Sequence, residues 1–164
     1  MTLTKYFKFF LSVQNAILLH LFYLRRMELK ERELILKNHR LRVTNCRLDV
    51  LKMFSMVDHA LSQKDLEGSL KNYDRVTLYR TLQSFIDKGV LHKIPNESGV
   101  ATFGICFDTC TSEDHNHNHL HFKCNQCGNI ECIENQPIPK IDIPNGYKVQ
   151  HWNMIVDGLC KSCA

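Results

Sequence analysis

Two Cys-x-x-Cys pairs constrain this 164-residue chain more than any other feature of its sequence. The first pair is Cys124 and Cys127, the second is Cys160 and Cys163, and thirty-two residues separate them. Each pair on a tight turn presents two thiolates, so two such turns brought together close a tetrahedral four-cysteine zinc site. Gly128 suits the sharp turn after the first pair. Disulfides and a redox Cys-x-x-Cys are the alternatives, but no signal peptide supports an oxidising compartment.

A run of alternating histidines lies directly upstream of the first pair. It consists of His115, His117, His119 and His121. If this segment is extended, alternation at period two points all four imidazoles to one face of a strand. Histidine is the commonest metal ligand, so the run predicts a second metal site, with a surface run of no function as the alternative. Cys132 is expected on the paired strand, and a thiolate beside imidazoles favours Zn(II) over Fe(II) or Mn(II).

Charge and cysteine content divide the chain into two parts. Residues 1–26 carry a net charge of +4 and residues 27–102 carry +3, whereas residues 103–164 carry −3. Only Cys46 of the eight cysteines lies before residue 106. Any surface that faces nucleic acid is therefore expected before about residue 102. With 44% apolar and 23% charged residues, the composition excludes a disordered polyelectrolyte, a collagen-like fibre and a multi-pass membrane protein.

The first 26 residues are apolar but interrupted by polar side chains. They lack the clean apolar run and small-residue cleavage site of a signal peptide. A membrane span needs about 20 predominantly apolar residues, which this stretch barely reaches, so we consider a membrane partner improbable. The charged helix-forming segment that starts at Met27 suggests another explanation. We expect residues 1–26 to be an extension upstream of the true start.

The basic part predicts four short helices followed by a β-hairpin. Thr44, Ser62 and Asp74 are expected to cap three of these helices, and Gly89 to end the last. Two short apolar runs on either side of the turn residues 95–99 predict the hairpin. This order of elements suggests a winged helix-turn-helix whose last helix enters the major groove of DNA.

The outward side chains of that last helix are candidates for DNA contacts. They are Arg75, Thr77, Tyr79, Arg80 and Gln83. Arginine supplies a charged fork and tyrosine a flat ring with a hydroxyl, which suit phosphates and base edges. Charge alone favours a merely solvated helix face, since +3 is weak for a DNA-binding protein. The arrangement of the elements, not the charge, favours DNA binding.

Four motifs occur in order along the chain. They are Arg42-Val-Thr44-Asn-Cys-Arg47, Val76-Thr-Leu-Tyr79-Arg80-Thr-Leu82, His119-Leu-His121-Phe-Lys-Cys124-Asn-Gln-Cys127-Gly128 and Gly158-Leu-Cys160-Lys-Ser-Cys163. Together they resemble the ferric uptake regulator family of metal-dependent repressors, over about residues 28–163. The resemblance implies an N-terminal winged helix, a C-terminal α/β dimerisation domain, and a homodimer that binds palindromic operators when its sensing site is metallated.

The resemblance also implies roles for individual residues. The four paired cysteines match the structural zinc ligands of the family, and His119 and His121 match the His-x-His of its sensing site. His59 lies close to the position of the histidine ligand in the DNA-binding domain, one residue earlier than usual. Tyr79 and Arg80 match the recognition-helix residues that meet DNA. Arg42 matches a basic residue near the DNA backbone.

The chain departs from the family pattern at two ligand positions. The acidic residue at the end of the wing is Gly104 here, and the carboxylate after the first knuckle is Cys132. A site that loses oxygen ligands and gains sulfur should prefer zinc, which argues against peroxide sensing. Cys106 is a candidate replacement for the wing ligand, although Cys106 and Cys110 also fit two ordinary linker thiols. His151 resembles the late histidine of an additional site, displaced by one residue.

We therefore predict an α+β chain with a winged helix-turn-helix followed by a small α/β dimerisation domain. We expect residues 27–105 to form the DNA-binding domain and residues 115–164 to form the domain that binds metal and dimerises. Residues 106–114 are expected to be the linker between these two domains. The predicted function is a cytoplasmic, zinc-responsive repressor that binds operator DNA as a homodimer, with no catalytic residues and no small-molecule substrate. The regulatory ion is expected on His59, His119, His121 and Cys132.

Three alternatives remain at this point. An iron- or peroxide-responsive repressor of the same family differs only in the sensed species. A zinc enzyme would hold a catalytic ion in the histidine cluster, but no His-Glu-x-x-His motif or nearby general base is visible. A structural zinc module that binds a protein partner would not need the predicted recognition helix.

Overall fold

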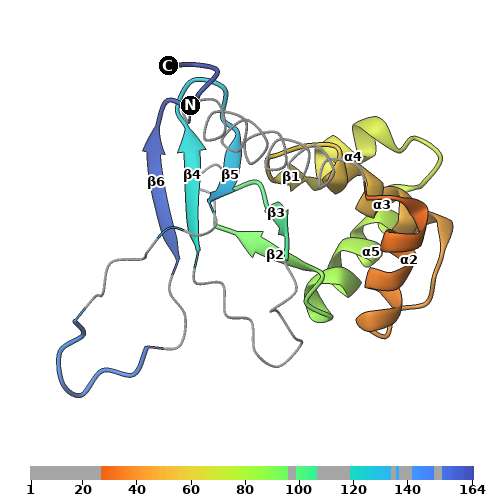
Figure 1. Cartoon of the computed structure of the whole chain (residues 1–164), viewed down its shortest axis with the longest axis horizontal. Coiled ribbons are helices and arrows are strands. Elements are labelled where there is room, and N and C mark those ends of the chain that lie inside the picture. The colour runs from red at the N-terminus through yellow and green to blue at the C-terminus, as the bar shows by residue number, and fades with distance from the viewer. Residues whose placement is uncertain (1–26, 96–98, 107–118, 134–135, 137–141, 150–152) are drawn as a thin grey trace, which may run out of the picture.

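The computed structural model describes residues 27–95, 99–106, 119–133, 136, 142–149 and 153–164. The expectations for residues 1–26, for residues 107–114 of the linker, and for Cys110, His115, His117 and His151 lie outside these residues. The described part is a mixed helix-and-sheet structure, in which a helical region comes first and a three-stranded sheet last (Figure 1). No helix in these ranges is both long and apolar enough to cross a bilayer.

Four helices build the first part of the chain. They are α2 (Leu29–Asn38), α3 (Asn45–Ser55), α4 (Gln63–Ser69) and α5 (Arg75–Asp87). The expected caps are confirmed: the Thr44 hydroxyl caps α3, Ser62 forms a capping box with Asp65, and Asp74 accepts a 2.9 Å bond from the Thr77 N–H. Helix α5 ends at Asp87, and Gly89 two residues later has a φ of 72°, which lies in the left-handed region.

The first helix ends earlier than its apolar pattern predicts. Apolar residues suggest a helix over residues 29–41, but α2 stops at Asn38. Arg40 adopts a φ of 55°, which an α-helix does not allow. The Leu41 N–H still donates to the Leu36 carbonyl at 2.7 Å, so the chain closes the helix with a turn and keeps Leu41 buried.

A small antiparallel sheet packs against these helices. Its strands β1 (Leu61–Ser62), β2 (Leu91–Ile94) and β3 (Thr102–Ile105) lie in the order β1-β3-β2. The pairing of β2 with β3 confirms the predicted hairpin. Apolar side chains of the helices and of this sheet share one core. Its largest fully buried members are Leu36, Leu51, Leu66, Leu78, Leu82, Phe85 and Leu91.

The second sheet is formed by β4 (Leu120–Cys124), β5 (Ile130–Ile133) and β6 (Met154–Gly158), in the order β5-β4-β6. Strand β5 runs antiparallel to β4, and β6 runs parallel to it. The apolar pattern predicts the last strand from Tyr147, but β6 begins at Met154. Tyr147 and Val149 are exposed, and β4 offers pairing partners only from Leu120 onward, opposite Met154.

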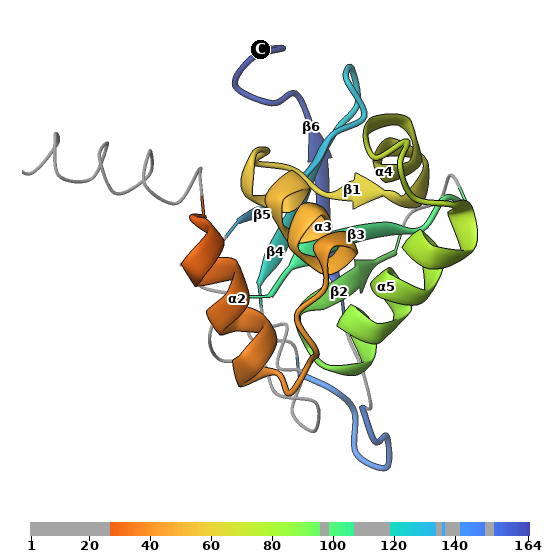
Figure 2. The same cartoon turned by 90° about the vertical axis from the view of Figure 1, so that its right-hand side faces the viewer.

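The two sheets meet near the start of β1. The Ala60 N–H donates a 2.7 Å hydrogen bond to the carbonyl of Ile130 at the start of β5. Figure 2 shows β4 and β5 lying behind α2 and α3, next to the strands of the first sheet. Strand β2 follows α5 after only a short turn. A side chain on β2 can therefore connect the last helix of the first part with the second sheet.

Candidate metal centres and nucleic-acid interface

A cluster of histidine and cysteine side chains lies where the two sheets meet. His92 comes from β2, His119 precedes β4, His121 lies on β4 and Cys132 lies on β5. One ligand atom from each of these four residues lies within 4.8 Å of all the others. The cluster therefore draws its donors from both parts of the chain.

Strand register explains why these side chains converge. His121 lies directly opposite Cys132 in the β4–β5 pair, so both point to the same face of the second sheet. In the first sheet His92 lies opposite Gly104. His119 is two residues before His121, and alternation along the chain brings both imidazoles to one side, with their ring centroids 4.6 Å apart.

The imidazole of His92 is at the centre of this cluster. Its Nε2 lies 3.1 Å from Nε2 of His121 and 3.7 Å from Sγ of Cys132. Its Nδ1 lies 3.5 Å from Sγ of Cys106, just after β3. Cys106 thus adjoins the cluster on the other side of the ring.

Burial gives the cluster a low dielectric. His92 is 4% exposed and His121 is 2% exposed. Burial also lowers the pKa of His119, which favours the neutral imidazole at pH 7, the form that binds metal ions. Three imidazoles and one thiol converge here, two of the residues buried and two half-buried, and they fit a transition-metal ion well, because soft and borderline donors suit Zn(II) better than an oxygen-seeking cation.

The donors of this cluster differ in one position from those expected. His119, His121 and Cys132 come together, and His92 completes the set. His59 is not among the four converging residues. His92 stands alone in its apolar strand, so ligand spacing does not single it out. The one signal available is its predicted register against Gly104, because a glycine inside a strand indicates close approach by another group.

The four paired cysteines form a second cluster. Their sulfur atoms lie within 4.8 Å of one another, and Sγ of Cys127 lies 3.9 Å from Sγ of Cys160. Tight turns present both pairs: the Gly128 N–H donates to the Cys124 carbonyl, and the Cys163 N–H donates to the Cys160 carbonyl, each at 2.9 Å. None of the seven cysteines that the structure describes is in a disulfide.

The electrostatics of this second cluster suit a cation. Backbone N–H groups of Cys127 and Cys160 hydrogen-bond to the Cys124 sulfur and lower the pKa of its thiol to about 6. The hydrogen bond to Cys160, followed by burial, raises the pKa of Cys163 to about 12. One thiolate therefore forms readily, while four together need a positive charge among them. Four thiolates on two turns match a closed structural zinc site.

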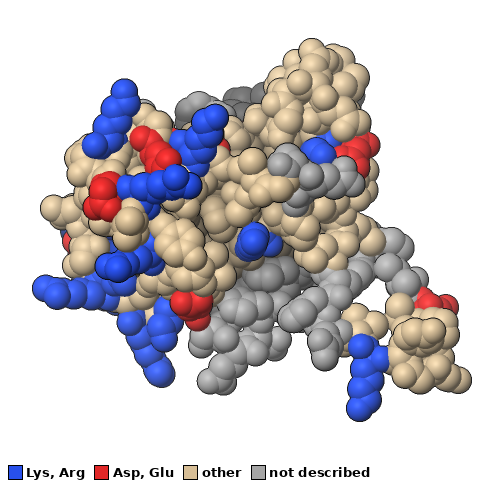
Figure 3. Space-filling model, turned by 180° about the vertical axis from the view of Figure 1, so that it is seen from behind, with Lys and Arg blue, Asp and Glu red and all other residues tan. Residues whose placement is uncertain are grey.

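Helix α5 presents the candidate DNA-binding side chains. Tyr79 is 55% exposed and Arg80 is exposed beside it, whereas Thr77 is half-buried and donates its hydroxyl to Asp74 at 2.6 Å. Arg42 is exposed before α3, and its carbonyl accepts a 2.7 Å bond from Nη1 of Arg47. Lysine and arginine side chains gather over the helical part in Figure 3.

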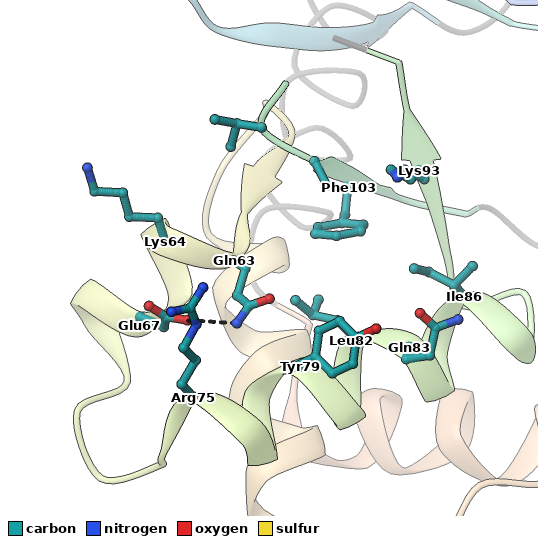
Figure 4. A pocket seen from close by; sticks show the side chains of 12 residues that line it. Gln63, Lys64, Glu67, Arg75, Tyr79, Leu82, Gln83, Ile86, Lys93 and Phe103 are labelled. Carbon is teal, nitrogen blue, oxygen red and sulfur yellow. Dashed lines mark hydrogen bonds and ion pairs between the residues drawn. The ribbon is translucent and has the colours of Figure 1, made fainter. Parts of the chain in front are cut away.

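A groove of about 540 Å³ lies between α4, α5 and the β2–β3 hairpin. Figure 4 shows Phe103 of β3 facing Tyr79 and Leu82 of α5 across this groove. At one end Glu67 accepts a 2.7 Å bond from Gln63 and forms an ion pair with Arg75 at 3.5 Å. The exposed Arg75 is thereby held at the start of α5.

Comparisons with known proteins agree with this picture. The model of the ferric uptake regulator family matches residues 38–156. A ferric uptake regulation protein of Staphylococcus epidermidis is 34% identical over 135 residues, which is 79% of this chain and 91% of that protein. A peroxide-responsive repressor of Staphylococcus saprophyticus is 28% identical over 137 residues, covering 78% and 86% respectively.

Solved structures share the fold. A zinc uptake regulator in complex with zinc and DNA superposes with a TM-score of 0.56 at 23% identity, over 82% of this chain and 91% of that one. The ferric uptake regulator of Vibrio cholerae gives a TM-score of 0.51 at 20% identity, over 76% of this chain and 96% of that one.

Proposed function

The chain belongs to the ferric uptake regulator family of metal-responsive transcriptional regulators, which are not enzymes, and we propose that it is a zinc-responsive repressor. In this proposal the protein is cytoplasmic and represses genes of metal homeostasis. It binds palindromic operator DNA as a homodimer and takes no small-molecule substrate. The observation that carries the proposal is the cluster of His92, His119, His121 and Cys132 between the two sheets.

The DNA-binding part is a winged helix-turn-helix over residues 27–105. The four helices α2 to α5 followed by the β2–β3 hairpin support this assignment, with α5 as the recognition helix and the hairpin as the wing. Tyr79 and Arg80 read the major groove from the exposed face of α5. Arg42 contacts the backbone, and Thr77 holds the first turn of α5 in place through Asp74. Residues 106–114 link this domain to the dimerisation domain over residues 115–164.

The regulatory ion is held by His92, His119, His121 and Cys132, with Cys106 beside His92. A bound ion would supply coordinate bonds to donors that lie on or next to β2, β4 and β5. Three nitrogens and one sulfur favour Zn(II) over Fe(II) and Mn(II), which are better held by carboxylates. His92 replaces His59 in the ligand set because its imidazole lies within the cluster and that of His59 does not.

The position of His92 explains how the cluster controls DNA binding. Strand β2 follows α5 directly, so a fixed His92 fixes the recognition helix relative to the dimerisation domain. Two half-sites on DNA require one spacing between two recognition helices. Without the ion the DNA-binding domains can move apart (the open state), and with it they are held at the spacing of the two half-sites (the closed state). Shifting the population from mostly open to mostly closed needs a difference of about 5 kcal/mol in zinc affinity between the two states, which transition-metal ligation can supply.

The four-cysteine cluster holds a structural zinc ion that stays bound in both states. Strand β6 supports dimerisation, because it is the outer strand of the described sheet and exposes Val156, with Leu159 exposed just after it. Such a strand offers unpaired backbone groups and apolar surface to a second copy of itself. A twofold dimer matches a palindromic operator.

A DNA-binding titration tests the proposal. The full chain is incubated with DNA fragments that it has itself selected from a random library, under reducing, anaerobic, buffered-metal conditions. We expect Zn(II) to switch on binding at much lower free concentration than Fe(II) or Mn(II), and Cys132→Ala to remove this response. Tyr79→Ala should abolish DNA binding while leaving zinc binding unchanged.

Iron sensing is the competing function, because ferric uptake and peroxide-responsive regulators are among the relatives. Activation by Fe(II) at its own physiological level, with zinc adding nothing beyond the structural ion, would overturn the zinc assignment. Tight and still zinc-dependent DNA binding by Cys132→Ala would overturn the assignment of the site instead.

A further inference from the structure

We propose that Gly104 is a positioning residue for the histidine–cysteine cluster, because its missing side chain leaves the space in which His92 and Cys132 meet. The inference rests on the proposed function, since it concerns how the regulatory site is assembled. It adds a residue that binds no metal itself and acts through its neighbours.

The backbone does not explain why residue 104 is glycine. Gly104 lies inside β3 and is buried. Its φ is outside the left-handed region, where Gly89, Gly99, Gly128 and Gly146 lie. A glycine in a strand interior weakens the strand and offers no side chain for packing. A strand therefore keeps a buried glycine when another group needs the space.

The group that needs the space is the cluster. A Cβ atom at Gly104 would lie 2.8 Å from Cε1 of His92, 3.0 Å from its Nε2 and 3.0 Å from Sγ of Cys132. Carbon atoms do not approach this closely without a shift of one partner. The nearest of these contacts involves the imidazole that His121 and Cys106 hold from opposite sides. His92 is also 4% exposed, so its ring has little free space into which it could move.

The two displaced groups belong to different sheets. His92 lies on β2 in the first sheet, directly opposite Gly104, and Cys132 lies on β5 in the second. Their present separation, 3.7 Å from Nε2 to Sγ, is what allows one ion to be held by both. A methyl group at residue 104 would push these donors apart. A larger side chain would take the place of one of them, so glycine preserves the imidazole-and-thiolate donor set.

The test uses the full chain with Gly104→Ala, and Gly68→Ala as the matched control, because a Cβ at Gly68 meets nothing within 4 Å. Each variant keeps its structural zinc and is titrated with Co(II), whose thiolate charge-transfer and d–d absorption report the second site. We expect Gly104→Ala to bind Co(II) and Zn(II) at that site at least about tenfold more weakly, with altered d–d bands. Gly68→Ala should bind like the wild type.

A combined variant separates positioning from stability. If the methyl group acts by colliding with His92 and Cys132, then adding Gly104→Ala to a variant that already carries His92→Ala and Cys132→Ala should leave its melting temperature unchanged. A further loss of stability in the combined variant would assign Gly104 a merely structural role and overturn the proposal. Wild-type affinity and spectrum in Gly104→Ala would overturn it as well. If the wild type binds only one ion per chain, the proposed function fails instead.

Discussion

The Nε2 atoms of His92 and His121 lie 3.1 Å apart, although the two residues belong to different sheets. His92 lies on β2, which follows α5, the proposed recognition helix, and His121 lies on β4 between β5 and β6. At this distance one imidazole N–H can donate to the other ring. The same two nitrogens belong to the proposed ligand set of one metal ion. This contact links the first part of the chain, which we propose binds DNA, to the second sheet through two side chains.

The first prediction concerns His92. Replacing His92 with Ala removes one donor and the contact with His121, so affinity of the regulatory site for zinc should fall at least about 100-fold. Zinc-dependent DNA binding should disappear, while one structural zinc per chain remains. Competition with a chromophoric chelator measures the affinity, and gel shift or fluorescence anisotropy measures DNA binding.

His59→Ala is the matched control for that experiment. His59 is another histidine of the first part of the chain, half-buried where His92 is buried, and it is not among the converging donors. Its removal should change zinc affinity less than threefold, by about 0.6 kcal/mol or less. A loss of zinc response in His59→Ala, with His92→Ala responding normally, would return the site to the ligand set first expected from the sequence.

Local sequence signals predict much of this fold. The caps at Thr44, Ser62 and Asp74 and the glycine stop at Gly89 act within a few residues, so the sequence alone indicates them. The two cysteine pairs are equally local, because spacing defines each turn. The length of the last strand is not determined by a local signal, because β6 extends only along the residues of β4 that pair with it.

Local sequence signals do not identify His92 as a candidate ligand. Its neighbours in the cluster lie at least 27 positions away in the chain and on other strands. Nothing in the apolar run around it distinguishes a ligand from a buried histidine. Only the packing of the two sheets, including the bond between Ala60 and Ile130, brings it to His121. Contacts between domains are not encoded in local periodicity.

The second prediction concerns metal preference. Replacing Cys132 with Asp exchanges the only sulfur of the cluster for a harder oxygen donor. The ratio of Zn(II) to Fe(II) affinity at the regulatory site should fall by about tenfold or more, because thiolates favour zinc and carboxylates favour Fe(II) and Mn(II). Competition titrations under anaerobic conditions give this ratio. An unchanged ratio would indicate that Cys132 does not bind the metal.

The third prediction concerns the four-cysteine cluster. Among the residues that the structure describes, the buried members of the main hydrophobic core run from Leu36 to Phe103, and the second sheet buries few apolar side chains of its own. Folding of the second sheet should therefore depend on the structural zinc ion. Cys127→Ser should lose that ion, and hydrogen exchange should show loss of protection in β4, β5 and β6 with α3 and α5 still protected. Retained protection in β4 without zinc would contradict this dependence.

The fourth prediction concerns DNA contacts. Arg80→Ala removes a charged fork from the exposed face of α5 and should weaken operator binding by about 1–3 kcal/mol. Lys161→Ala removes the same charge after β6, far along the chain from α5, and should have little effect. Anisotropy titrations at two salt concentrations measure both. Equal losses in the two variants would indicate that only net charge matters, not the position of Arg80.

The last prediction concerns a contact that supports the recognition helix. The Tyr73 hydroxyl, just before α5, donates a 2.6 Å hydrogen bond to Oδ2 of Asp49 on α3. This bond, helped by burial, raises the pKa of Tyr73 from 10.0 to about 12. Folding therefore favours the protonated phenol, so its contribution to stability is complete below about pH 10 and is lost as the pH rises through about 12.

Tyr73→Phe tests this contact because it removes the hydroxyl and keeps the ring. At pH 7 the variant should unfold with about 1 kcal/mol less free energy than the wild type, a modest value because Tyr73 is half-exposed. The difference should shrink as the pH rises from 10 toward 12, since only the wild type loses the bond. Urea unfolding of both proteins at several pH values measures it. Other alkaline-titrating groups are common to both chains and cancel in the comparison, so a difference that stays constant up to pH 12 would contradict the raised pKa.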